Sequence, residues 1–171
     1  PNCLGVINTA IRMNASFSRR IPQAGSMAIF SQSGALCTAM MDIADERELG
    51  VSKAISIGNK ADITEVDVLE ALAEDEGTRV IVGYLEDISD GDRFVKAAEA
   101  ASNRKPVVIL KAGTTTAGSR AAANHTGVLV GTYTAYGPAF KRAGLCRSDP
   151  FPPLFVSAPA LALQPTPKRV R

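Results

Sequence analysis

The chain has 171 residues, of which 46% are hydrophobic and 21% charged, and its formal net charge at pH 7 is +2. This length suits one domain with its own buried core, and the small net charge excludes the strongly basic surface with which proteins bind nucleic acid or anionic membranes. No apolar run approaches the roughly 20 residues of a membrane-spanning helix, so we expect neither a nucleic acid nor a membrane partner.

The first half of the chain alternates short apolar runs with segments of helical periodicity. The run SMAIF (26–30) predicts a strand, and the segment 33–49 has apolar residues at helical spacing before a stop at Gly50. KAISIG (53–58) predicts the next strand, and 63–75 predicts the next helix.

The second half repeats this alternation. RVIVGYLE (79–86) is a continuous apolar strand, and 90–103 predicts a helix opened by acidic residues. PVVILKAG (106–113) is a fourth strand, and a helix near 132–142 and a short strand at 145–147 follow.

Apolar strands that are each followed by a helix are typical of a parallel sheet covered on both faces. We therefore predict a doubly wound, mainly parallel, flavodoxin-like α/β domain over residues 1–149. Residues 150–171 contain six prolines and are predicted to be a proline-rich tail or linker. Ligands of such sheets bind beyond the carboxyl ends of the strands, so the residues that follow each strand are the candidate site.

The first strand is followed by Ser31, Gln32, Ser33 and Gly34. Ser33 suits the N-cap of the next helix, and a first turn of small residues presents free N–H groups and the positive end of the helix dipole. Such a terminus binds anions, although plain capping explains Ser33 equally well.

His125 is the only histidine of the chain and lies in AANHTGVLVG, beyond the fourth strand. A lone histidine is most often a solvated loop residue. A carboxylate such as Glu86, at the end of the third strand, would instead orient the imidazole and stabilise its charged form. If these strands are neighbours, the Ser33 helix terminus, Glu86 and His125 converge on one edge of the sheet.

Two other groups of polar residues carry weaker expectations. Lys60 and Asp62, in the loop after the second strand, are expected to form a solvated turn rather than to contact substrate. The three cysteines, at 3, 37 and 146, are odd in number and scattered, so we expect no disulfide, no metal site and a reducing, cytoplasmic location.

Six segments, in this order, resemble the nucleoside-diphosphate-forming acyl-CoA synthetases, relatives of the succinyl-CoA synthetase α subunit: PNCLGVIN, IFSQSGAL, ISIGNKADI, YLEDISDGDRF, KPVVILKAGTTTAGSRAA and NHTGVLVG. The likeness is greatest to the ADP-forming acetyl-CoA synthetases and extends from residue 1 to about 147. The chain departs from that family at Asn124, where a small residue such as Ser is usual, and in its proline-rich tail.

The resemblance implies a mechanism, in which acyl-CoA and phosphate give an acyl phosphate, a histidine takes the phosphoryl group, and a swinging loop delivers it to ADP. It implies that His125 is the phosphohistidine and Glu86 its carboxylate partner. It also implies that the turn from Ser31 to Gly34 holds phosphate and that Asn2 and Cys3 lie near the thioester. Cys3 itself is expected to be a packed small residue rather than a nucleophile.

The resemblance implies partners as well. Family members bind CoA on a preceding domain, and they bind ATP or ADP with Mg²⁺ on an ATP-grasp domain. Neither is expected within this sequence, which begins PNCLG without an initiator Met. We therefore expect a piece of a longer enzyme, inactive alone, whose partners are those domains and the acyl-CoA substrate.

Two alternatives belong to other classes of protein. Some relatives are sensor modules fused to a lysine acetyltransferase, often with the histidine replaced, and the retention of His125 and Glu86 favours the ligase. A flavodoxin-like flavin or nucleotide binder is disfavoured because aromatic residues make up only 5% of the chain and tryptophan is absent.

Overall fold

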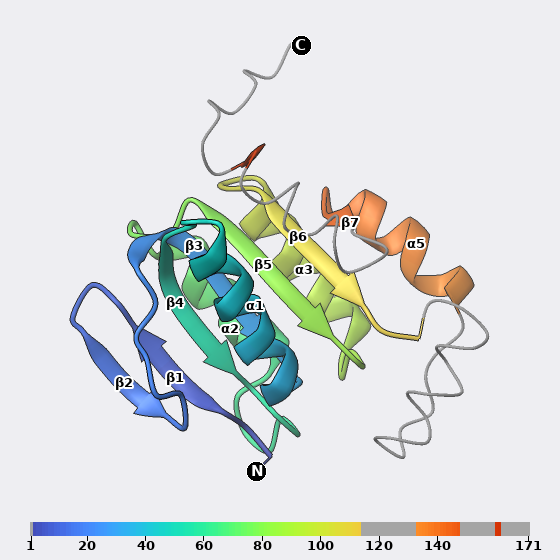
Figure 1. Ribbon diagram of the computed structural model, residues 1–171. Helices are drawn as coiled ribbons and strands as arrows, with labels where there is room; N and C mark the ends of the chain where they lie inside the picture. The colour runs from blue at the N-terminus through green and yellow to red at the C-terminus, as the bar shows by residue number, and fades with distance from the viewer. Residues whose placement is uncertain (1, 114–132, 148–159, 162–171) are drawn as a thin grey trace.

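The computed structural model describes residues 2–113, 133–147 and 160–161 (Figure 1). The strands are β1 (Gly5–Asn8), β2 (Met13–Ser16), β3 (Ala24–Ser31), β4 (Val51–Ser56), β5 (Val80–Leu85), β6 (Val107–Lys111) and β7 (Cys146–Arg147). The helices are α1 (Gly34–Glu46), α2 (Glu65–Glu74), α3 (Gly91–Ser102) and α5 (Tyr133–Arg142). Within this part of the chain the strands form one seven-stranded sheet, in the order β2-β1-β4-β3-β5-β6-β7.

The five strands from β4 to β7 in that order are parallel to their neighbours. The chain passes from β3 to β4 on one side and then crosses back to β5 on the other side of β3. This is the flavodoxin order, and it places a topological switch point between β3 and β5. The predicted doubly wound α/β fold is confirmed, and each predicted strand and helix lies within a few residues of an observed one.

The N-terminal hairpin of β1 and β2 was not predicted. β1 pairs antiparallel with both β2 and β4, so the sheet is mixed at this edge. Each hairpin strand has only four residues, and within β1 only Ile7 is buried. Strands this short do not show the alternation by which a half-buried strand is recognised in a sequence.

Helices cover both faces of the sheet, with α1 on one face and α2 and α3 on the other (Figure 1). Alternate residues of β3 enter the two cores: Ile29 packs beneath α1, and Phe30 packs with α2 and α3. Both cores therefore need apolar residues from the same strand, which is why the strands read as continuous apolar runs. Helix α5 joins the second core through Phe140, whose ring centroid lies 5.8 Å from that of Phe94 on α3.

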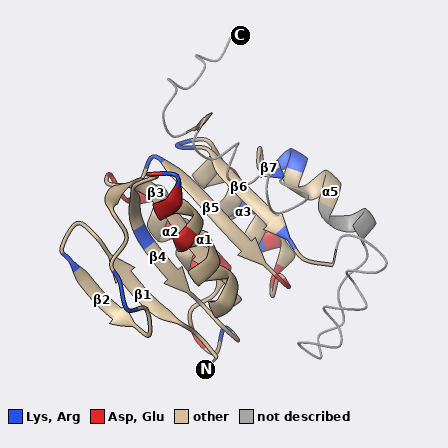
Figure 2. Cartoon of the chain, in the orientation of Figure 1, with Lys and Arg blue, Asp and Glu red and all other residues tan. Residues whose placement is uncertain are grey.

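Three further features concern the charge of the domain, membrane-spanning helices and the tail. In the view of Figure 2, the Lys and Arg residues and the Asp and Glu residues are scattered over the domain, in keeping with the small net charge. No helix of the described part is long and apolar enough to cross a membrane. Of the predicted tail, only residues 160–161 are described, and Leu161 packs against the core beneath α1.

Candidate functional site

A pocket of about 670 Å³ opens at the carboxyl edge of the sheet, beside the switch point between β3 and β5. Five segments far apart in the sequence line it: the chain before β1, Phe17 after β2, the start of α1, the loop after β4 and the loop after β5. The lining residues are Asn2, Cys3, Leu4, Phe17, Gln32, Ser33, Gly34, Ala35, Thr38, Gly58, Asn59, Lys60, Glu86 and Asp87.

The structure brings most of the predicted site residues together around this pocket. Asn2, Cys3, Gln32, Ser33, Gly34 and Glu86 all line it. Ser31 is fully buried at the end of β3 and does not line the pocket. His125 lies outside the described residues, so its predicted role stays a prediction.

The turn between β3 and α1 is held by its own serines. The Ser31 hydroxyl donates to the Ser33 carbonyl at 2.7 Å and accepts from the Ser33 N–H at 3.1 Å. Ser33 has the extended backbone of an N-cap, and its hydroxyl accepts from the Leu36 N–H at 3.3 Å. The first N–H groups of a helix have no partner within the helix. Because Gly34 and Ala35 border the pocket, this end of α1 offers an anion those donors and the positive end of the dipole.

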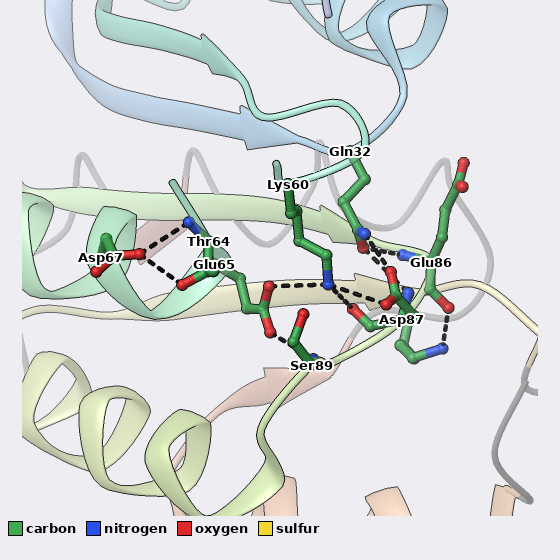
Figure 3. A network of polar contacts seen from close by, with 9 residues as sticks. Gln32, Lys60, Thr64, Glu65, Asp67, Glu86, Asp87 and Ser89 are labelled. Atoms are coloured by element: carbon green, nitrogen blue, oxygen red, sulfur yellow. Dashed lines mark hydrogen bonds and ion pairs between the residues drawn. The ribbon is translucent and has the colours of Figure 1, made fainter. Parts of the chain in front are cut away.

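Gln32 does not project into solvent, because its side chain turns toward the end of β5 (Figure 3). The residue is only 6% exposed. Its amide oxygen accepts from the backbone N–H groups of Glu86 and Asp87, and its amide nitrogen donates to the Asp87 carboxylate. One side chain thus ties the turn at the start of α1 to the loop after β5.

The expectation that Lys60 forms a solvated turn is wrong. Its side chain is 5% exposed, and its ammonium nitrogen lies 3.1 Å from Glu65 Oε2 and 3.0 Å from Asp87 Oδ2 (Figure 3). Glu65 is fully buried, and its Oε1 accepts from the Ser89 N–H at 2.9 Å. The partners of Lys60 come from α2 and from the loop after β5, so the local sequence around Lys60 contains no sign of its burial. Asp62 is exposed, as expected.

Glu86 is half-buried on the pocket wall, and its backbone is held on both sides. Gln32 accepts from its N–H, and the Lys111 ammonium donates to its carbonyl at 2.6 Å. The Glu86 side chain points away from the pair of Lys60 and Glu65 (Figure 3). Burial raises the pKa of the nearby Tyr84 to about 12, and the negative charge of Glu86 adds to this shift.

Lys111 ends β6 and is 2% exposed. Its ammonium also donates to the Ala112 carbonyl at 2.8 Å. Burial lowers the pKa of Lys111 to about 8, because a charged amine loses hydration there. The sequence showed only a lysine at the end of an apolar strand, which is more often a solvated residue.

Cys3 is exposed at the pocket, so the expectation of a packed small residue is wrong. The unpredicted hairpin explains the difference, because the chain that leads into it places Asn2 and Cys3 along the pocket, and only the next residue, Leu4, packs against a core. Asn2 has a left-handed backbone, with φ of 59°, and its side chain donates to Asn59 at 3.2 Å. Cys37 instead lies on the buried face of α1, and burial raises the pKa of its thiol to about 12.

The start of α1 is the part of the pocket whose chemistry suits an anion. Within the described residues no group of three or more His, Cys, Asp or Glu side chains is arranged to hold a metal ion. The pocket offers helix N–H groups at Gly34 and Ala35, while the ammonium group of Lys60 lies between two carboxylates.

Several residues of the site were not singled out from the sequence, namely Asp87, Glu65, Lys111, Thr38 and Phe17. Asp87 directly follows Glu86 at the end of a predicted strand, and this position was the one available signal. The others are recognised only when separate segments meet in space.

Comparisons with known proteins give a consistent result. The family described as succinyl-CoA ligase like flavodoxin domain matches residues 24–161. The ADP-forming acetate–CoA ligase I of Archaeoglobus fulgidus is 46% identical over 155 residues, which make up 91% of this chain and 23% of that protein. The α subunit of the ADP-forming acetate–CoA ligase I of Pyrococcus furiosus is 41% identical over 168 residues, or 98% of this chain and 36% of that subunit.

A solved structure extends the likeness to three dimensions. It is that of the dinucleotide-forming acetyl-coenzyme A synthetase 1 of Candidatus Korarchaeum cryptofilum in complex with phosphate and ADP. It has a TM-score of 0.94 and 38% identity, covering 99% of this chain and 37% of that one. The chain thus spans 23% to 37% of the length of these relatives.

Proposed function

Because this chain belongs to the family of succinyl-CoA ligase-like flavodoxin domains, as the resemblance of its motifs predicted, we propose that it is the phosphoryl-relay domain of an ADP-forming acid–CoA ligase. The whole enzyme would interconvert acyl-CoA, phosphate and ADP with the free acid, CoA and ATP. The relay would run through an acyl phosphate and through phosphorylated His125.

Each group of predicted site residues has a task in this proposal. The turn of Ser31, Gln32, Ser33 and Gly34 holds the phosphate group at the positive end of α1. His125 takes the phosphoryl group from the acyl phosphate, releasing the free acid, and passes it to ADP. Glu86 accepts a hydrogen bond from the imidazole, which sets its tautomer and stabilises the ring when it is charged.

A single observation carries the proposal. The start of α1 and the half-buried carboxylate of Glu86 border one pocket at the switch point, although more than 50 residues separate Gln32 from Glu86. An anion site beside a carboxylate is the arrangement that a histidine needs in order to receive and release a phosphoryl group.

The proposal places the remaining substrates on other parts of the enzyme. Asn2 and Cys3 border the pocket, where Asn2 contacts Asn59 of the loop after β4, and would lie near the thioester. CoA and Mg²⁺ with ATP or ADP would bind mainly on the CoA-binding and ATP-grasp domains or subunit. The phosphate and ADP in the solved relative agree with this choice of ligands.

The first test is phosphohistidine formation by the full-length enzyme. We expect γ-labelled ATP with magnesium to give an acid-labile, base-stable label on the wild-type protein and none on the His125→Ala variant. Absence of label on folded, nucleotide-bound wild-type enzyme would contradict the relay and favour a sensor module of the kind that is fused to an acetyltransferase.

The second test addresses Glu86. We expect Glu86→Gln to slow labelling by roughly 10- to 100-fold, the usual cost of removing the carboxylate that orients a functional histidine. The midpoint of thermal unfolding should not change. Glu70→Gln, which alters an exposed carboxylate on α2, is the matched control. An unchanged labelling rate in Glu86→Gln would remove Glu86 from the site.

A further inference from the structure

We propose that Gln32 is a positioning residue, which acts on phosphoryl transfer by holding Glu86 in place rather than by binding phosphate with its side chain. This inference rests on the proposed role of Glu86 as the partner of His125. It changes the task expected for Gln32 from the sequence, where the residue is simply one member of a phosphate-binding turn.

The amide group of Gln32 is engaged at both of its ends. Its oxygen accepts from two consecutive N–H groups, those of Glu86 and Asp87, and its nitrogen donates to Asp87 Oδ1. The Gln32 backbone N–H also donates to the Tyr84 carbonyl, at 3.2 Å. The residue is 6% exposed, and its side chain cannot turn toward an anion without leaving two backbone N–H groups without their acceptor.

The peptide units around Glu86 are held from three further directions. Lys111 donates to the Glu86 carbonyl at 2.6 Å, and Lys60 lies 3.0 Å from Asp87 Oδ2. Glu65 accepts from the Ser89 N–H at 2.9 Å. The segment from Glu86 to Ser89 is therefore tied to the ends of β3 and β6, to the loop after β4 and to the start of α2, while the Glu86 side chain points away from these contacts (Figure 3).

Stability alone does not explain why these charged and polar side chains are buried around the Glu86 loop. Buried ion pairs are often no more stabilising than apolar side chains of the same volume, and Lys60 and Glu65 are 5% and 0% exposed. The turn at Ser31 and Ser33 is already closed by its own hydroxyl groups and does not need Gln32. Gln32 is distinguished by joining the turn at the start of α1 to the backbone of Glu86, the residue that carries the orienting carboxylate.

The consequence is a fixed spacing between two functional groups. A site that transfers a group between an anion and a histidine needs its orienting carboxylate held to within about 0.5 Å. Gln32 spans the gap between the start of α1 and the end of β5, so it sets the distance from the bound anion to Glu86.

The test is a double-mutant cycle on the full-length enzyme, with single-turnover labelling of His125 from γ-labelled ATP as the measurement. Gln32→Met keeps the side-chain volume but removes all three hydrogen bonds, and Gln32→Ala is the second variant should Gln32→Met not fold. We expect Gln32→Met to slow labelling roughly 10-fold in the wild-type background and less than about 2-fold in the Glu86→Gln background, because residues that act through one another are not additive. Equal losses in both backgrounds would overturn the inference.

Hydrogen exchange provides a readout that does not depend on catalysis. In the full-length protein, the amides of Glu86 and Asp87 should exchange at least about 10-fold faster in Gln32→Met, since their acceptor is lost. Gln23→Ala, at an exposed glutamine before β3, is the matched control and should alter neither exchange nor labelling.

The two measurements separate the failure of each proposal. Unchanged hydrogen exchange at Glu86 and Asp87 would show that Gln32 does not hold these residues in place, whatever the labelling rate of the enzyme. Faster exchange in Gln32→Met, combined with no labelling of the wild-type enzyme, would overturn the proposed relay. Gln32 would then hold Glu86 in place without a role in phosphoryl transfer. Faster exchange together with the non-additive loss of labelling is the result that the inference requires.

Discussion

Each edge of the sheet has a lysine paired with carboxylates, but the ion pairs at the two edges have different roles. At the carboxyl edge, Lys60 lies between Glu65 and Asp87, and the side chains of Lys60 and Glu65 are 5% and 0% exposed. At the amino edge, Lys53 of β4 pairs with Asp75 at the end of α2, and these side chains are 22% and 21% exposed. The first pair adjoins the pocket, whereas neither residue of the second lines it.

The amino-edge contacts have a plain structural purpose. Thr78 and Lys53 both donate to Asp75 Oδ2, and Lys105 donates to the carbonyls of Leu72 and Asp75 where α2 ends. Burial acts to raise the pKa of Asp75, but the hydrogen bonds from Lys53 and Thr78 outweigh it and lower the pKa. These contacts cap a helix and join it to the sheet.

The difference shows that the importance of an ion pair depends on its burial and on the segments of the chain that it holds in place. Water reaches the amino-edge pair, so its charges cost little to bring together and contribute little. The carboxyl-edge charges have lost most of their hydration, which is costly, and they organise the loop that carries Glu86. Variants at the two edges should therefore behave differently.

The largest effect is expected from Lys60→Met. It leaves the fully buried Glu65 without its cation, and breaking a buried pair in this way typically costs about 3–5 kcal/mol of the free energy of unfolding. Urea unfolding of the full-length protein measures this cost. Lys60→Met combined with Glu65→Gln should recover most of the loss, because the uncompensated charge is gone. A loss below about 1 kcal/mol for Lys60→Met alone would show that the ion pairs of Lys60 contribute no more to stability than the partly exposed pair at the amino edge.

An intermediate effect is expected from the titration of Lys111. In the unfolded chain its pKa is the ordinary 10.5, and in the folded chain burial lowers the pKa to about 8. Between these pH values the unfolded state binds more protons, so a rise in pH stabilises the folded state by up to about 1.4 kcal/mol per pH unit. Below pH 8 the buried charge opposes folding to a constant extent.

Lys111→Met isolates this contribution from that of other titrating groups. The free energy of unfolding of the wild type minus that of the variant should increase from pH 8 to pH 10, as measured by urea unfolding at several pH values. A difference that does not vary over this range would show that the Lys111 ammonium keeps its hydration in the folded protein.

The smallest effect is expected from Lys53→Met at the amino edge. A partly exposed pair contributes up to about 1 kcal/mol, and Thr78 continues to donate to Asp75. Labelling of His125 in the full-length enzyme should match that of the wild type. Slower labelling with unchanged stability would mean that the amino edge also serves the reaction, and the distinction between the edges would fail.

The sequence by itself determined the class of fold. Apolar runs followed by amphipathic segments require a sheet with both faces covered, and every such run became a strand. The resemblance of the motifs identified the family, and the positions that follow β3 and β5 named Ser33, Gly34 and Glu86 as site residues that line the pocket. The fold and the meeting of these residues at one pocket could be predicted because they depend on local periodicity and on the rule that parallel strands end at a common edge. The roles of these residues in phosphoryl transfer stay predictions.

Only the tertiary structure decided how those residues are held. The hairpin of β1 and β2 gains its order from pairing with β4, because its own four-residue strands bury too little apolar surface to be recognised. The burial of Lys60 depends on Glu65 and Asp87, and the bonds of Gln32 depend on a peptide more than 50 residues away. Residue type and local pattern carry no record of such partners, because a charge is paired or solvated according to which distant segment the fold brings beside it.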